Sequence, residues 1–171
     1  MNFLDLAKSR YSVRSYSDAD VEQENLDKIV EAAMLAPTAC NNQPQRIYLL
    51  HSADALAKIR SLTPCTYDAP AVFMICSDSS RSWHSPFDSG YESGEMDASI
   101  VCTHMMLEAQ ELGLGSCWVL LFDPERIRSV FSLPENIRPV CLLPVGYPAE
   151  SSRPASDHSK TRSVSDVYCE L

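Results

Sequence analysis

The chain has 171 residues, a formal net charge of -9, and 45% apolar against 22% charged side chains. This length and composition predict one soluble, folded domain that buries a sizeable core without disulfides or metal ions. The acidic balance argues against nucleic-acid or anionic-membrane binding, because both begin with a broad excess of Lys and Arg.

Cysteine and histidine positions exclude further classes. The seven cysteines are spread singly without a Cys-x-x-Cys pair, which indicates reduced thiols rather than disulfides or a zinc site. The four histidines also lack metal-ligand spacing, so no metal site is predicted. No uncharged run is long enough for a membrane span, and Asp5 and Lys8 interrupt the place of a signal-peptide core. We therefore expect a cytoplasmic protein.

The first half of the sequence predicts three helices and two strands. Apolar residues of 22–35 recur at i, i+3, i+4, i+7 and i+8, as on one helix face, and Pro37 disfavours helical geometry at the preceding residue. The unbroken apolar run at 70–76 is typical of a strand buried on both faces. The other elements expected here are a helix at 3–9 capped by Asn2, a proline-bounded polar loop at 37–45, a strand at 46–51 and a helix at 53–61.

The second half predicts a long helix at 95–112 with two apolar faces. Such a helix must pack on two layers, and the second layer is either another subunit or the rest of the monomer. One face consists of Met96, Ile100 and Leu107, and the other of Val101, Cys102, Met105, Met106, Ala109 and Leu112. The other predictions are a lid or substrate loop at 78–93, a buried strand at 116–122, a helix beginning at Asp123, a strand at 139–146 placed at a sheet edge by Pro144, and a surface segment at 147–159.

Two guanidinium groups and a hydroxyl recur at every second position near the N-terminus. If residues 10–14 are extended, Arg10, Ser12 and Arg14 share one face, and Tyr11 and Val13 share the other. We call the first three residues the clamp, because Arg forks and a Ser hydroxyl suit a phosphate group. The alternative is a solvated basic edge leading into a helix.

Two more polar clusters accompany the clamp. Asn41 and Gln43 lie in the proline-bounded loop, and Lys160 and Arg162 place two more cations at i and i+2. Together the clusters favour a ligand with a phosphate at one end and a hydrogen-bonding heterocycle at the other. Neither a Rossmann Gly-x-Gly-x-x-Gly nor a P-loop motif is present, so a different phosphate site is expected.

These motifs resemble the FMN-dependent nitroreductase family in their order and spacing. They are Arg-Tyr-Ser-Val-Arg at 10–14, Ala-Pro-Thr-Ala-Cys-Asn-Asn-Gln-Pro at 36–44, Asp97, Gly-Leu-Gly-Ser-Cys-Trp at 113–118, and Lys-Thr-Arg at 160–162. The resemblance covers nearly the whole chain. It implies one α+β domain at 1–171, with a central mixed or antiparallel sheet flanked by helices. It also implies an intertwined homodimer with FMN at its interface, and an extension at 147–171 that returns to the phosphate site.

The resemblance also implies the cofactor-binding residues. They are Arg10, Tyr11, Ser12, Arg14, Pro37, Thr38, Ala39, Asn41, Gln43, Leu120, Leu121, Lys160 and Arg162. The clamp would hold the phosphate with Lys160 and Arg162, and residues 37–43 would line the flavin, with Asn41 or Gln43 coming from the partner subunit. The backbone near Leu120 and Leu121 would face the reactive N5 edge of the ring.

The sequence departs from the family pattern in three places. Leu120 and Leu121 stand where members often have Gly or a Glu-Gly pair, and Gln45 stands where a Trp is common. Ser61, Thr63 and Thr66 occupy the stretch where some members place an Asn and a Lys beneath the pyrimidine end. These departures concern the identity of the substrate more than the binding of the cofactor phosphate.

The function implied by the resemblance is FMN-dependent oxidoreduction. Hydride from NADH or NADPH would be passed on to a nitroaromatic, a quinone or a similar small acceptor by a ping-pong mechanism. The flavin does this chemistry, so no protein side chain is predicted to be catalytic. The alternatives are a specialised reaction of the same fold, such as reductive dehalogenation or flavin fragmentation, and a flavin-binding or storage protein without turnover. The substitutions at Leu120 and Leu121 favour the last.

Overall fold

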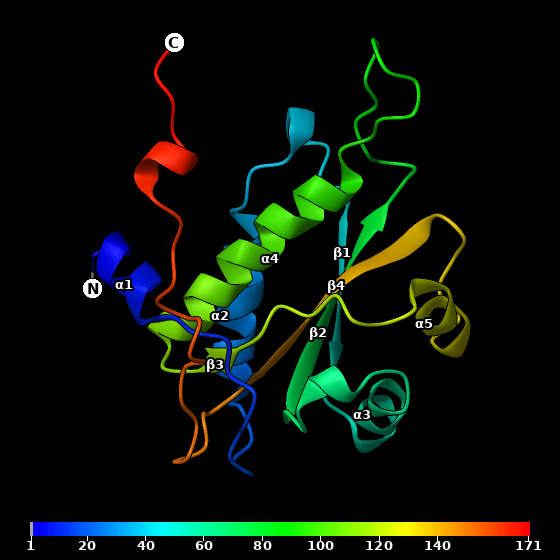
Figure 1. The fold of residues 1–171 in the computed structure, drawn as a ribbon. Helices are drawn as coiled ribbons and strands as arrows, with labels where there is room; N and C mark the ends of the chain where they lie inside the picture. The colour runs from blue at the N-terminus through cyan, green and yellow to red at the C-terminus, as the bar shows by residue number, and fades with distance from the viewer. Residues whose placement is uncertain (1) are drawn as a thin grey trace.

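A four-stranded antiparallel sheet forms the centre of the protein (Figure 1), as a computed structural model describing residues 2–171 shows. The strand order is β1-β2-β4-β3. The strands are β1 (Gln45–Leu50), β2 (Ala71–Asp78), β3 (Gly115–Ser116) and β4 (Ile137–Gly146). The helices are α1 (Phe3–Ser9), α2 (Gln23–Met34), α3 (Ala53–Arg60), α4 (Gly94–Glu111) and α5 (Pro124–Val130). This confirms the expected α+β architecture.

Helices cover both faces of the sheet. Phe73 and Ile75 of β2 point to one face, where they pack with buried residues of α2 and α4. Val72 and Met74 point to the other face, which α3 and α5 cover. This alternation follows from the two-residue period of a strand. Every residue of β2 is buried, which confirms the strand predicted from the apolar run at 70–76.

Local signals predicted the helix starts well. The side chains of Asn2, Ser52 and Asp123 cap α1, α3 and α5, where each accepts a hydrogen bond from a backbone N–H of the first turn. Such caps satisfy donors that have no partner inside the helix. The ranges predicted for the two long helices differ by one residue at each end from α2 and α4.

The buried strand predicted at 116–122 is wrong. Only the two residues of β3 pair with β4 in a ladder. At the next position Cys117 donates its N–H to the carbonyl of Pro144 at 3.3 Å, but Pro144 has no N–H to return. The ladder is therefore interrupted there. Val119 pairs with Leu142 in an isolated bridge and is buried, and the chain reaches the surface only beyond it, with Leu120 and Leu121 more than half exposed.

The position expected for the last strand is also corrected. Strand β4 lies between β2 and β3 rather than at the edge of the sheet. In a strand, the N–H and C=O of one residue point to the same neighbour, and the Pro144 carbonyl accepts from Cys117. The missing N–H of Pro144 thus faces β3, which pairs with β4 at only two residues, and the hydrogen bonds between β4 and β2 are kept.

Helix α4 buries one of its two predicted apolar faces. Val101, Cys102 and Met105 are at most 1% exposed, whereas Met96 and Ile100 are 52% and 39% exposed. Helix α1 contacts α4 and has no buried residue of its own. Within residues 2–171 no helix has the length and apolar character needed to span a bilayer. The exposed Met96 and Ile100, together with the unburied α1, thus form an apolar surface along α4.

Candidate functional site

The clamp lies in an extended run beside β3. Ser12 forms a parallel bridge with Ser116, and Val13 donates its N–H to the Ser116 carbonyl at 2.9 Å. Val13 is 1% exposed, so its side chain points into the core. A Cβ on Gly115 would lie 2.5 Å from Cγ2 of Val13, so glycine is required for this close approach. The two-residue alternation predicted for this run is thus present, with Val13 on the inner side.

The three clamp side chains all lower the pKa of one thiol, that of Cys117. Burial raises the pKa of Cys117 above its ordinary value, and Arg14, a hydrogen bond from Ser12, and Arg10 each oppose that rise. Cys117 is 3% exposed and follows β3 directly. The structure therefore gathers Arg10, Ser12 and Arg14 around the beginning of the 117–122 segment. This arrangement concentrates positive charge at one point of an acidic protein.

The C-terminal segment returns to the clamp. The Tyr11 hydroxyl lies 3.1 Å from Oγ of Ser152, and its ring packs edge-to-face on His158 with centroids 6.3 Å apart. Figure 1 shows the end of the chain running beside α1. A cavity of about 210 Å³ remains between the two segments, lined by Ser12, Arg14, Ala155, Asp157 and His158. It has the donors that a phosphate group requires.

Lys160 and Arg162 contact groups of the C-terminal segment itself. Lys160 forms an exposed ion pair with Asp157. Arg162 donates to the Asp166 carbonyl at 2.9 Å. The structure thus brings their segment to the clamp, while their side chains face other partners.

Residues 37–43, which we call the polar loop, hold an unusual backbone. They contain a 3-10 turn at Ala39–Asn41, and Cys40, Asn41 and Gln43 have φ angles of 51°, 55° and 51°. Thr38 fixes this shape, because its carbonyl accepts from Asn41 N at 3.0 Å and its Oγ1 from Gln43 N at 3.1 Å. The Gln43 amide donates to Oδ1 of Asn41 at 3.2 Å. Amide groups are thus presented in one defined arrangement.

The clamp and the polar loop lie at opposite ends of α4. The Ala39 N–H donates to Oδ1 of Asp97, in the first turn of the helix, whereas the clamp bridges Ser116, just beyond its last turn. The 18 residues of α4 span about 27 Å at 1.5 Å per residue. One chain therefore does not bring together the two groups that the sequence assigned to one ligand.

The segment after Cys117 places two apolar side chains at the surface. Leu120 and Leu121 are 64% and 68% exposed. The Leu121 carbonyl accepts from Oγ1 of Thr63 at 2.6 Å, and Thr63 is 2% exposed. Thr63, considered above as a residue near the pyrimidine, thus supports the backbone of this segment.

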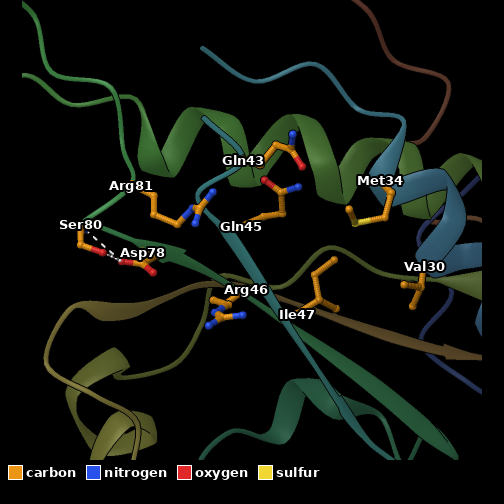
Figure 2. Close-up of a pocket in the computed structure, with 9 residues that line it drawn as sticks. All are labelled: Val30, Met34, Gln43, Gln45, Arg46, Ile47, Asp78, Ser80 and Arg81. Carbon is orange, nitrogen blue, oxygen red and sulfur yellow. Dashed lines mark hydrogen bonds between the residues drawn. The ribbon is translucent and has the colours of Figure 1, made fainter. Parts of the chain in front are cut away.

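A cavity of about 510 Å³ lies beside the polar loop. Figure 2 shows the side chains of Gln43, Gln45, Arg46 and Arg81 gathered at one side and those of Val30 and Met34 of α2 at the other. Burial alone would raise the pKa of Asp78, also in the cavity wall, but hydrogen bonds from Ser80 and Asn136 lower it below its ordinary value. The cavity therefore combines two guanidinium groups and two amides with an apolar wall.

Comparison with known proteins places this arrangement in a family. A family model described as the nitroreductase family matches residues 7–63 and 60–147. The chain belongs to the nitroreductase family. It is 35% identical over 158 residues to a protein of Methanothermobacter thermautotrophicus named as an NADH dehydrogenase/NAD(P)H nitroreductase, in a match that covers 88% of this chain and 80% of that protein.

Solved structures of the nitroreductase family share the fold. A nitroreductase family protein from Clostridium difficile has a TM-score of 0.92 and 42% identity, over 99% of this chain and 98% of that one. An FMN-dependent nitroreductase from the same organism has a TM-score of 0.78 and 26% identity, over 99% of both chains. The family resemblance seen in the motifs is therefore confirmed.

Sequence reasoning did not assign a role to several residues of this nitroreductase-family site. Thr63 and His158 support or border the site through long-range contacts that no local pattern reveals. Asp97 was noted as part of a motif, but its bond to Ala39 spans 58 positions.

Proposed function

We propose that the protein is an FMN-dependent oxidoreductase that takes hydride from NADH or NADPH and passes electrons to a nitroaromatic, a quinone or a similar small acceptor. The observation that carries the proposal is the pair of complementary half-sites, a cationic clamp and a rigid amide-bearing loop. Membership of the nitroreductase family supports it, as do relatives named as NAD(P)H nitroreductase and FMN-dependent nitroreductase.

The donors present fit FMN. Arg10, Ser12 and Arg14 supply charge-assisted and neutral donors for the phosphate, and the 210 Å³ cavity beside them leaves space for it. The backbone and amides at 37–43 suit a planar heterocycle that carries both donors and acceptors. When bound, FMN supplies the hydride and electron transfer, and the protein binds and orients it. Donor and acceptor then use the same site in turn, which is the ping-pong mechanism.

A homodimer would complete each site. The exposed Met96 and Ile100 and the unburied α1 form an apolar surface along α4. In a dimer whose two-fold axis is perpendicular to α4, the two copies of α4 run in opposite directions, so the first turn of one lies near the last turn of the other. The polar loop of each subunit then faces the clamp of its partner. This removes the separation that α4, about 27 Å long, imposes between the half-sites of one chain.

The test of this function is optical and kinetic. Purified protein is expected to show the visible absorption of a bound flavin, released as FMN on denaturation. NADH or NADPH oxidation should depend on added menadione or nitrofurazone and should give parallel lines in double-reciprocal plots. A protein that retains FMN without such turnover would instead be a binding or storage protein, and one that binds no FMN would contradict the proposal.

A further inference from the structure

The polar loop is held in its strained shape from outside. Three residues without glycine's freedom have positive φ angles in a stretch of four, at Cys40, Asn41 and Gln43. Each such residue costs free energy and persists only where surrounding contacts over-determine it. Bonds to Thr38 act within the loop. One bond to a buried carboxylate connects it to the rest of the protein.

That carboxylate belongs to Asp97, which joins two segments. Its Oδ1 accepts from Ala39 N–H at 2.9 Å, and its Oδ2 accepts from Oγ of Ser93 at 2.7 Å. Asp97 is 3% exposed and Ser93 is 4% exposed. The charge is compensated by both hydrogen bonds and by its place in the first turn of α4, where the helix dipole favours an anion. An Asp without such partners would not be buried.

The network continues into the 79–93 loop. Oγ of Ser93 also accepts from the backbone N–H of Trp83 at 3.2 Å. Trp83 packs edge-to-face on Tyr91, and Ser85 N–H donates to the Tyr91 carbonyl at 3.0 Å. The loop, which rises beyond the first turn of α4 in Figure 1, is therefore an ordered hairpin-like segment. Its base is connected to the polar loop through Ser93 and Asp97.

Two further bonds join these segments or the residues directly beside them. Arg81 Nε approaches the Asn42 carbonyl at 3.4 Å, and Asp78 N–H donates to the Pro44 carbonyl at 2.8 Å. The two segments are thus bonded on both flanks of the polar loop. A change in one of them must be transmitted to the other unless these bonds break.

We propose that Asp97 is a positioning residue that holds the polar loop ready for FMN and couples it to the 79–93 loop. This rests on the proposed function, since the polar loop is assigned to the cofactor there. Both carboxylate oxygens of Asp97 accept from protein groups, Ala39 and Ser93, and the residue is 3% exposed. It acts through Ala39 on the flavin side and through Ser93 and Trp83 on the other, so that ordering either segment stabilises the other.

The test compares Asp97→Ala and Asp97→Asn in FMN titrations and in hydrogen exchange of the FMN-free protein. Asp97→Ala removes both acceptors, and we expect the Kd for FMN to rise about ten- to a hundredfold. Amide exchange should increase at 38–43 and at 83–93, while β2 keeps its protection. The Asp97→Asn variant retains an acceptor for Ala39 and places an amide donor against Ser93, so it should lose less than about tenfold in affinity.

The matched control is Glu95→Gln, in the same turn of α4. Glu95 forms an exposed ion pair with Arg138 at 3.1 Å, and such pairs contribute little. Its FMN affinity should stay within about twofold of the parent. The proposal is overturned if Asp97→Ala leaves the Kd and both segments unchanged. It is also overturned if exchange increases uniformly across the sheet, because a merely structural residue would act in that way.

A further variant covers the case in which Asp97→Ala does not fold. Ser93→Ala keeps the bond between Asp97 and Ala39 but removes the connection to Trp83. Faster exchange at 83–93 with a measurable rise in the Kd for FMN supports the coupling, and unchanged values for both contradict it. If the parent protein binds no FMN, the proposed function fails, yet looser 38–43 and 83–93 segments in Asp97→Ala would still establish Asp97 as their shared anchor.

Discussion

The two ends of helix α4 build half-sites in different ways. At the C-terminal end, the clamp depends on charged side chains that alternate along an extended run, and Arg14 is exposed to solvent. At the N-terminal end, the polar loop depends on backbone conformation, with three positive φ angles held by Thr38 and Asp97. Charge attracts an anion without a defined pose, whereas a rigid loop selects a shape. A ligand that needs both the charge of the clamp and the fixed shape of the polar loop must contact both ends of α4.

The largest expected effect comes from removing the charge at the clamp. The double variant Arg10→Ala/Arg14→Ala should weaken FMN binding at least about a hundredfold, because each hydrogen bond to a charged group contributes about 1.5 to 3 kcal/mol. Isothermal titration of the flavin-free protein measures it. Lys58→Ala, which breaks an exposed ion pair on α3, is the control and should bind FMN normally. Equal affinity in the double variant would exclude the clamp as the phosphate site.

Mixing two defective proteins tests whether the ends meet across subunits. The clamp double variant and a loop variant, Asn41→Gly/Gln43→Gly, should each bind FMN poorly, and glycine keeps the positive φ angles accessible. After joint refolding in equal amounts, about a quarter of the sites should recover, because half the dimers are mixed and each has one intact site. Flavin absorbance after desalting gives the occupancy. No recovery would mean that each site lies within one chain.

The contact that seats the clamp is expected to have an intermediate effect. Gly115→Ala places a methyl group 2.5 Å from Val13 Cγ2 and should lower the free energy of unfolding by about 1 to 3 kcal/mol. Urea denaturation measures this change. Gly90→Ala, whose new Cβ meets only Asp88 at 3.6 Å, is the matched control and should leave the midpoint nearly unchanged. Wild-type stability in Gly115→Ala would contradict the close approach described here.

The smallest effect is a pH dependence at the polar-loop end. The folded-state pKa of Asp78 lies below its ordinary value, so its ionised form stabilises the fold at pH values above the unfolded-state pKa of about 3.9. This contribution is lost as the pH falls through the folded-state pKa.

The measurement is the unfolding free energy between pH 7 and pH 3. Asp78→Asn should be less stable at pH 7 and should lose less stability than the parent on acidification. Asp54→Asn, which removes an exposed carboxylate from α3, is the control and should follow the parent curve. An Asp78→Asn curve parallel to that of the parent would show that this carboxylate has no shifted pKa.

Local patterns in the sequence were sufficient for most elements and for the clamp. Helix caps such as Ser52, the apolar run of β2 and the amphipathic stripe of α2 depend on neighbours within a few residues. The alternation at 10–14 is local too, and the structure retains it. A family resemblance carried by short motifs was confirmed over most of the chain.

Only the tertiary structure decided the rest. The strand predicted at 116–122 ends after β3 because Pro144 lies opposite Cys117, which depends on the register of a strand far along the chain. The bond from Ala39 to Asp97 joins positions 58 residues apart. The separation of clamp and polar loop follows from the length of α4 lying between them. Side-chain patterns report on nearest neighbours along the chain, whereas register and relative placement depend on contacts between distant elements, which such patterns do not encode.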